Sequence, residues 1–138
     1  DILERKLRFL RLTNPLVVHA SVFALPFHDE AFECVICSQV IEHIPNTEDA
    51  ITELLRVLKP GGQLILGTPD FGSWQWPLIE KIYDRVIPGG YAEEHINPLT
   101  RDNTVAMVER LGARFQAEDF ILRAEWVGSF VKLGNTDQ

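Results

Sequence analysis

The fold is decided by one stretch, Arg56-Val57-Leu58-Lys59-Pro60-Gly61-Gly62 followed by Gln63-Leu64-Ile65-Leu66-Gly67-Thr68-Pro69-Asp70. Pro60 cannot continue a helix, and the two glycines that follow it can adopt the positive φ that a sharp reversal needs. The apolar run at 64–66 is typical of a short strand that is covered on both faces. The stretch therefore predicts a helix end, a tight turn and a buried strand, which is the pattern of an α/β sheet.

The residues before this stretch carry a helical pattern. Apolar side chains recur at the spacing of one helix face, at Ile51, Leu54, Leu55 and Leu58. We expect Asn46 or Thr47 to cap the start of the helix, with Glu48 and Asp49 in its first turn, where they suit the helix dipole. Lys59 suits the dipole at the other end. The pattern predicts a helix over 47–59.

Similar patterns mark the other elements. They predict helices over 2–12 and 100–111, the second capped by Thr100 and ended by Gly112. Short β-rich runs predict strands over the ranges 16–20, 33–37, 63–68, 114–122 and 127–133. The alternation of helices and strands predicts one α/β domain over 1–138.

Composition narrows the classes of partner. The chain has 138 residues, of which 46% are hydrophobic, and a formal net charge of −7. A protein that binds a nucleic-acid backbone needs a basic face, so we expect no nucleic-acid partner. No apolar run is long enough to span a bilayer and no signal peptide is visible, so we expect no membrane partner.

The two cysteines form a Cys-x-x-Cys sequence, Cys34-Val35-Ile36-Cys37. Such a sequence can be a redox or metal motif. In a strand, however, positions three apart point to opposite faces, so these two sulfurs cannot share a metal or form a disulfide. We favour two small side chains packed in a strand, and we expect a reducing, cytoplasmic location.

Several short segments, taken in order, resemble a known family. They are Leu25-Pro26-Phe27, Phe32-Glu33-Cys34-Val35-Ile36, Val40-Ile41-Glu42-His43-Ile44, the Arg56–Gly62 stretch and Thr68-Pro69-Asp70. The set resembles the class I S-adenosylmethionine-dependent methyltransferases, in particular the small-molecule type 11 and ubiquinone-biosynthesis-like branch. The resemblance implies a Rossmann-like sheet, mostly parallel, with an antiparallel C-terminal strand pair and the strand order 3-2-1-4-5-7-6.

The resemblance also implies S-adenosylmethionine as cofactor and places its contacts. Ser21 stands where the family has an Asp that contacts the adenine, and it is a weaker hydrogen-bonding partner than a carboxylate. Val22 and Phe23 fall where the family offers a backbone N–H and an apolar wall to the adenine; core packing is the alternative for Phe23. The backbone at Ser38 and Gln39 corresponds to the segment that touches the methionine part. Asp1 matches the acidic residue that binds the ribose hydroxyls.

The acceptor side of the predicted site is less regular in sequence. The resemblance implies that an insertion over about 71–98, rich in Trp and Tyr, forms a lid over a small-molecule methyl acceptor; aromatic side chains that pin a long connection to the core are the alternative. For an oxygen or nitrogen acceptor a proton must be removed, and histidine is the natural base. His43 and His95 fall near the carboxyl ends of the strands, and we predict both as catalytic. No metal is required.

Three functions compete. The first is a methyltransferase, and the second is a catalytically incompetent methyltransferase-like fragment that serves as a binding or dimerisation module. The third is a dehydrogenase, which would need a Gly-x-Gly-x-x-Gly turn that the sequence lacks. The family's own glycine-rich loop precedes the residue matched by Asp1, so we expect a truncated domain without its N-terminal strands. The open edge of the 32–37 strand would then pair with the 16–20 strand or, as we favour, with a second copy in a homodimer.

Overall fold

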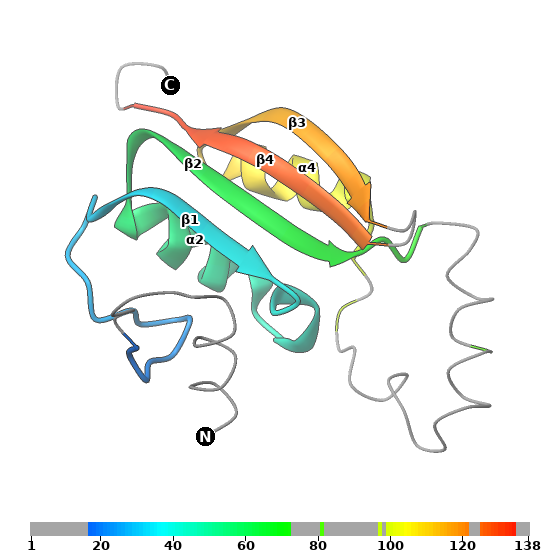
Figure 1. Cartoon of the computed structure of the whole chain (residues 1–138), viewed down its shortest axis with the longest axis horizontal. Helices are drawn as coiled ribbons and strands as arrows, with labels where there is room; N and C mark the ends of the chain where they lie inside the picture. The colour runs from blue at the N-terminus through cyan, green and yellow to red at the C-terminus, as the bar shows by residue number, and fades with distance from the viewer. Residues whose placement is uncertain (1–16, 73–80, 82–96, 98, 122–124, 135–138) are drawn as a thin grey trace, which may run out of the picture.

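The computed structural model describes residues 17–72, 81, 97, 99–121 and 125–134. Within these residues the fold is α/β, with four strands in one mixed sheet and two α-helices (Figure 1). The elements, in chain order, are β1 (Phe32–Ser38), η1 (Ile41–His43), α2 (Thr47–Val57), β2 (Leu58–Pro69), α4 (Arg101–Arg110), β3 (Ala113–Ile121) and β4 (Glu125–Lys132).

The strand order is β1-β2-β4-β3. The strands β1 and β2 are parallel, whereas β4 runs antiparallel to both β2 and β3. In the family's numbering, β1, β2, β3 and β4 correspond to strands 4, 5, 6 and 7. The observed order is therefore the 4-5-7-6 part of the implied order 3-2-1-4-5-7-6, and the antiparallel C-terminal pair is confirmed. The ends of β1 and β2 therefore lie beside the start of β4, and Figure 1 shows the arrowheads of β1 and β2 at this common edge.

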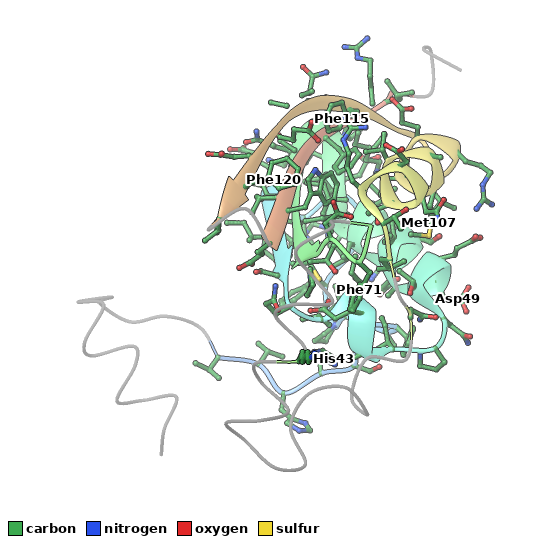
Figure 2. The ribbon with its side chains drawn as sticks, turned by 90° about the vertical axis from the view of Figure 1, so that its right-hand side faces the viewer. His43, Asp49, Phe71, Met107, Phe115 and Phe120 are labelled. Atoms are coloured by element: carbon green, nitrogen blue, oxygen red, sulfur yellow. The ribbon has the colours of Figure 1, made fainter. Side chains whose placement is uncertain are left out.

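One face of the sheet carries the hydrophobic core. The helices α2 and α4 lie on the same side of the sheet in both Figure 1 and Figure 2. Strand and helix side chains meet there, with the most deeply buried being Ile41, Ile51, Leu58, Leu64, Leu66, Val108, Trp126 and Phe130. On the opposite face Ile36 is 68% exposed. Because side chains alternate along a strand, this asymmetry explains why β1 has only one buried residue, Cys37.

The predicted turn at Pro60-Gly61 exists, but it lies within β2. Phe32 pairs with Leu58 and Cys34 pairs with Gln63, so residues 59–62 loop out between two points of the same ladder. Gly61 adopts φ 74°, as the prediction required. The helix α2 ends at Val57, two residues earlier than predicted. The reason is that Pro60 disfavours the helical conformation for the residue before it, so Lys59 leaves the helix and pairs instead with Glu33 at 2.9 Å.

Two further predictions were wrong. Residues 17–20 form no strand, and the nearest pairing is an isolated bridge between Ser21 and Ala24. Residues 17–20 therefore do not pair with the edge of β1. The side chains of Asn46 and Thr47 do not cap α2; the Thr47 hydroxyl instead donates to the carbonyl oxygen of Ile41 at 3.2 Å.

The remaining elements agree with the predictions. The Thr100 hydroxyl accepts from the N–H of Asn103 and caps α4 as expected, and Gly112 with φ 102° follows the helix end. Cys37 is buried and Cys34 is exposed, which confirms that the two thiols lie on opposite faces. The predicted helix over 2–12 lies outside the described residues, as do Asp1, His95 and most of the 71–98 insertion.

Candidate functional site

The candidate site lies at the edge of the sheet where β1 and β2 end. Figure 2 looks onto this edge, with His43 and Phe71 labelled. Ser38 is the last residue of β1, and Gln39 follows it with a left-handed φ of 56°. The Gln39 N–H donates to the carbonyl oxygen of Gly67 at 2.9 Å, which fixes this turn against β2. In open α/β sheets ligands bind outside this edge of the strands.

Gly67 makes room for the end of β1. A Cβ at this position would lie 2.8 Å from Ser38 Oγ and 3.4 Å from Oε1 of Glu125. The glycine therefore allows a hydroxyl from β1 and a carboxylate from β4 to approach the same point of β2 from either side. Ser38 and Gln39 are exposed, so the end of β1 presents polar groups to a ligand.

His43 lies in η1, directly after this turn. Its backbone N–H donates to the carbonyl oxygen of Val40 at 3.1 Å, and its side chain is 34% exposed. The imidazole Nε2 lies 3.7 Å from Oε1 of Glu42. The predicted catalytic histidine is thus at the expected edge of the sheet, beside a carboxylate.

Glu42 is the residue that sequence reasoning missed. Its side chain is completely buried, and Oε2 accepts a long hydrogen bond of 3.4 Å from the Thr68 hydroxyl. Oε1 is buried and has no hydrogen-bond partner among the described residues. Burial raises the pKa of the neighbouring Cys37 thiol to about 11, with a smaller contribution from the negative charge of Glu42. The adjacency of Glu42 to His43 was visible in sequence, but its burial was not.

The segment that precedes α4 is fastened to the same place. The Asn97 backbone N–H donates to the carbonyl oxygen of Glu42 at 3.1 Å, and its side chain donates to the carbonyl oxygen of Ile44 and, at 3.2 Å, to the Thr47 hydroxyl. Asp70, just after β2, accepts from the N–H groups of Gly72 and Arg101 at 3.1 and 3.2 Å. These contacts tie the two ends of the predicted insertion to the site edge.

The predicted adenine contacts form a local turn. The Ser21 hydroxyl accepts from the N–H of Phe23 at 3.3 Å, and Val22 packs against the core. Phe23 is 41% exposed, so it is not a core residue and the packing alternative for it is wrong. The adenine roles of these three residues stay predictions.

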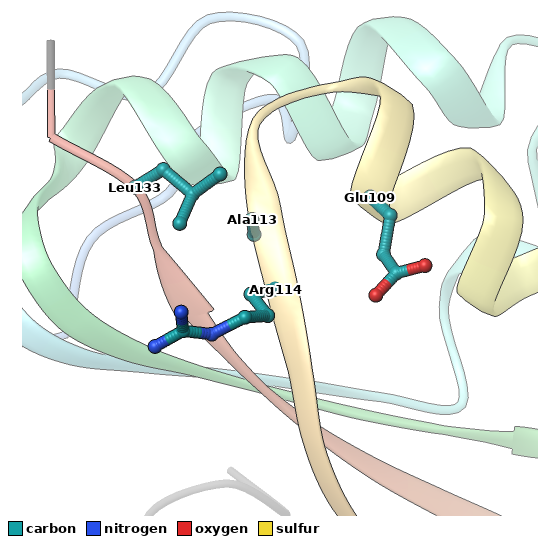
Figure 3. A pocket seen from close by; sticks show the side chains of 4 residues that line it. All are labelled: Glu109, Ala113, Arg114 and Leu133. Atoms are coloured by element: carbon teal, nitrogen blue, oxygen red, sulfur yellow. The ribbon is translucent and has the colours of Figure 1, made fainter. Parts of the chain in front are cut away.

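A shallow pocket of about 600 Å³ lies elsewhere, lined by Glu109, Ala113, Arg114 and Leu133 (Figure 3). Ala113 begins β3 and Leu133 follows β4, so this pocket lies at the opposite end of the sheet from His43. It is therefore separate from the candidate site. Within the described ranges, no group of His, Cys, Asp and Glu side chains could hold a metal ion, and no helix is long and apolar enough to cross a membrane.

Comparison with known proteins finds similar methyltransferases. Residues 1–66 match a family model described as a methyltransferase domain. A ubiquinone/menaquinone biosynthesis C-methyltransferase from Blochmanniella pennsylvanica is 38% identical over 82 residues, which cover 59% of this chain and 32% of the relative. A second protein of that name, from Bartonella henselae, is 38% identical over 72 residues, covering 51% of this chain and 27% of the relative. The match thus spans about a third of the length of these curated relatives.

Solved structures show the same fold. An S-adenosylmethionine-dependent methyltransferase from Thermotoga maritima, described as a possible histamine N-methyltransferase, superposes with a TM-score of 0.70 at 20% identity, covering 94% of this chain and 70% of that one. Magnesium protoporphyrin IX methyltransferase from Synechocystis, solved with bound S-adenosylhomocysteine, gives 0.69 at 15% identity, covering 94% and 57%. The sequence is thus similar to a methyltransferase domain over residues 1–66, and the fold is similar to that of S-adenosylmethionine-dependent methyltransferases.

Proposed function

We propose that this chain belongs to an enzyme that transfers a methyl group from S-adenosylmethionine to a small molecule. The observation that carries the proposal is the edge where β1 and β2 end. It brings together Ser38, Gln39, Gly67 and His43, with the buried carboxylate of Glu42 behind them. The similarity of residues 1–66 to a methyltransferase domain supports the reaction class.

The residues present at this edge fit the cofactor. Ser38 and Gln39 are exposed at a strand end, and Gly67 lacks the Cβ that would fill the space between Ser38 and Glu125. We assign the methionine part to Ser38 and Gln39, the adenine to Ser21, Val22 and Phe23, and the ribose to Asp1. When bound, the cofactor supplies an activated methyl group that already carries its leaving group.

The protein's task is then to orient the acceptor and remove its proton. We assign proton removal to His43 and His95, because an imidazole exchanges protons near neutral pH. Asn97 is bonded to Glu42 and Ile44, so the described end of the segment before α4 is held at this edge. The segment over 71–98, tied at both ends to this edge, is proposed as the cover of the acceptor.

Two classes of acceptor atom are supported by different observations. A histidine at the site favours an oxygen or nitrogen acceptor, as the sequence predicted. The curated relatives are named C-methyltransferases of ubiquinone and menaquinone biosynthesis, which favours a ring carbon of a quinone precursor. An assay with a catechol, an aryl amine and a hydroquinone, each with labelled S-adenosylmethionine, separates the two classes by the product formed.

The test of the histidines is substitution in the protein made from its whole gene. His43→Ala and His95→Ala should each lower kcat by about 100-fold or more, because a positioned base contributes about that much. His28→Ala is the matched control, since His28 is exposed and its ring Nδ1 makes a 2.7 Å hydrogen bond with the carbonyl oxygen of the neighbouring Asp29. Unchanged rates in both site variants would remove the histidines from the mechanism.

The second candidate is a binding or dimerisation module without catalysis. The exposed edge of β1 supports it, since this strand ends the described sheet and Ile36 is open to solvent. Calorimetric titration with S-adenosylmethionine distinguishes the two. Binding in the micromolar range supports the enzyme, and no binding by the whole protein supports the module.

A further inference from the structure

Glu42 is an unusual residue to find in the interior. Its side chain has no exposed surface, and it lies in the short η1 turn that follows the end of β1. Burial of a carboxylate without compensating partners is energetically unfavourable. A group of this kind at a strand end is a candidate for a functional role.

Of the two carboxylate oxygens of Glu42, one accepts a hydrogen bond within the described part of the chain and the other does not. Oε2 accepts from Thr68, whereas Oε1 is buried and receives no hydrogen bond from the described residues. The imidazole of His43, which can carry a positive charge, lies close to Oε1, with Nε2 at 3.7 Å. This distance is too long for a hydrogen bond but within the range of a close charge interaction.

The two side chains differ in their access to a ligand. Glu42 is enclosed by the core, with its backbone carbonyl held by Asn97, so it cannot reach an acceptor molecule. His43 is partly exposed at the edge of the sheet. A buried carboxylate behind a partly exposed imidazole stabilises the imidazolium that forms when the ring takes up a proton.

We propose that Glu42 is a positioning residue for His43: its buried carboxylate holds the imidazole at the site edge and balances the charge that the ring gains. This inference rests on the proposed function. In the step, the O–H, N–H or C–H bond of the acceptor breaks, its electron pair stays on the acceptor atom, and the proton forms a new N–H bond on His43. The proton leaves His43 to solvent after the product departs.

The first test needs no substrate. Nuclear magnetic resonance of the 15N-labelled imidazoles reports the tautomer and protonation of each histidine. Glu42→Gln keeps the size of the side chain but removes its charge, and it should change the ring-nitrogen signals of His43. The signals of His28, on the exposed loop, should stay the same and serve as the internal control.

A matched variant separates charge from packing. Thr68→Val removes the hydroxyl that donates to Oε2 but leaves the carboxylate facing His43. It should alter the His43 signals less than Glu42→Gln does. Equal changes in the two variants would show that His43 responds to packing alone, and would overturn the proposal.

A second measurement tests the same contact through the stability of the fold, and it applies even if Glu42→Gln is destabilised. The urea midpoints of Glu42→Gln, His43→Gln and the double variant form a double-mutant cycle. If the double variant loses less stability than the two single variants lose together, the contact between Glu42 and His43 is supported. Strict additivity of the two single changes overturns it.

Steady-state kinetics test whether Glu42 contributes to catalysis through His43. Glu42→Gln should lower kcat by about 10-fold to 100-fold with KM changed by less than about twofold, and Glu42→Asp should recover part of the rate. A change in the His43 signals with an unchanged kcat overturns the catalytic role. A wild-type protein that transfers no methyl group refutes the proposed function, while the resonance experiment still decides whether Glu42 holds His43.

Discussion

The guanidinium of Arg56 donates a hydrogen bond of 2.9 Å to the carbonyl oxygen of Phe27, which lies 29 positions earlier in the chain. A second guanidinium nitrogen donates to the carbonyl oxygen of Leu25 at 3.1 Å. One turn before Arg56, the Glu53 carboxylate accepts from the N–H of Leu25 at 2.7 Å. One face of α2 therefore holds the Leu25-Pro26-Phe27 segment, which explains physically why that segment and the Arg56–Gly62 stretch occur together.

Arg56→Lys should destabilise the fold by about 1–3 kcal/mol, because lysine keeps the charge but cannot make several directed bonds from one planar group. Urea unfolding at neutral pH measures the change. Arg110→Lys is the control, since Arg110 and its partner Glu48 are both mostly exposed. That substitution should change the free energy of unfolding by less than about 0.5 kcal/mol. Equal effects in the two variants would show that Arg56 does not hold the segment.

The ion pair of Glu53 predicts a pH dependence. The hydrogen bond from Arg56, and next that from the Leu25 N–H, lower the pKa of Glu53 from 4.5 to about 2. Because the pKa is lower in the folded state, the stabilisation is fully present above about pH 4.5 and is lost as the pH falls through about 2.

Glu53→Gln isolates this contribution. The wild type should exceed the variant in urea midpoint by a constant amount between about pH 7 and pH 5, and the difference should shrink steadily below that range. Measuring the difference between the two proteins removes the effect of other carboxylates that titrate over the same interval. A difference that stays constant down to about pH 2 would contradict the lowered pKa.

Gly128 allows the largest core side chain to lie flat along β4. A Cβ at this position would lie 2.3 Å from Cη2 and 2.4 Å from Cζ2 of Trp126. The indole is fully buried and is held by a 2.8 Å hydrogen bond from Nε1 to Glu118, so the ring cannot easily move aside. Gly128→Ala should therefore cost about 1–3 kcal/mol by overpacking.

The control for Gly128 is the next residue. Ser129→Ala removes a hydroxyl that accepts from the exposed Gln63 side chain, on the other face of the sheet, and should cost less than about 1 kcal/mol. Thermal unfolding followed by tryptophan fluorescence measures both variants. A Gly128→Ala protein as stable as the wild type would show that the indole has room to turn.

The elements that sequence predicted correctly are those whose pattern is local. The helices α2 and α4 have apolar spacing and punctuating residues, and β2 follows from its Pro-Gly turn and apolar run. The 17–20 segment failed because β-branched residues such as Val17 and Val18 favour a strand only when a neighbouring strand is there to pair with them. The burial of Glu42 depends on how η1 meets Thr68 and the core, residues distant in sequence, so no local pattern could reveal it.

The edge of β1 leads to the last prediction, that the chain forms a homodimer. In the described sheet β1 pairs only with β2, and the backbone groups of its other side are open to a new strand. The other edge strand, β3, carries Arg114, Glu118 and Asp119 and an irregularity in its register, features that discourage pairing. The β1 strand has one charge, Glu33, which Lys59 neutralises. We therefore propose that two copies pair through β1 about a twofold axis.

Substitution on each edge strand tests this proposal. Ile36→Lys puts a charge on β1 at a side chain that is 68% exposed, so the fold should survive while the dimer dissociates. Ile121→Lys makes the same change on β3, where the side chain is 51% exposed, and should leave the dimer intact. Light scattering over a concentration series gives the mass of each protein. A wild type that stays monomeric at high micromolar concentration, or an Ile36→Lys variant that stays dimeric, would refute pairing through β1.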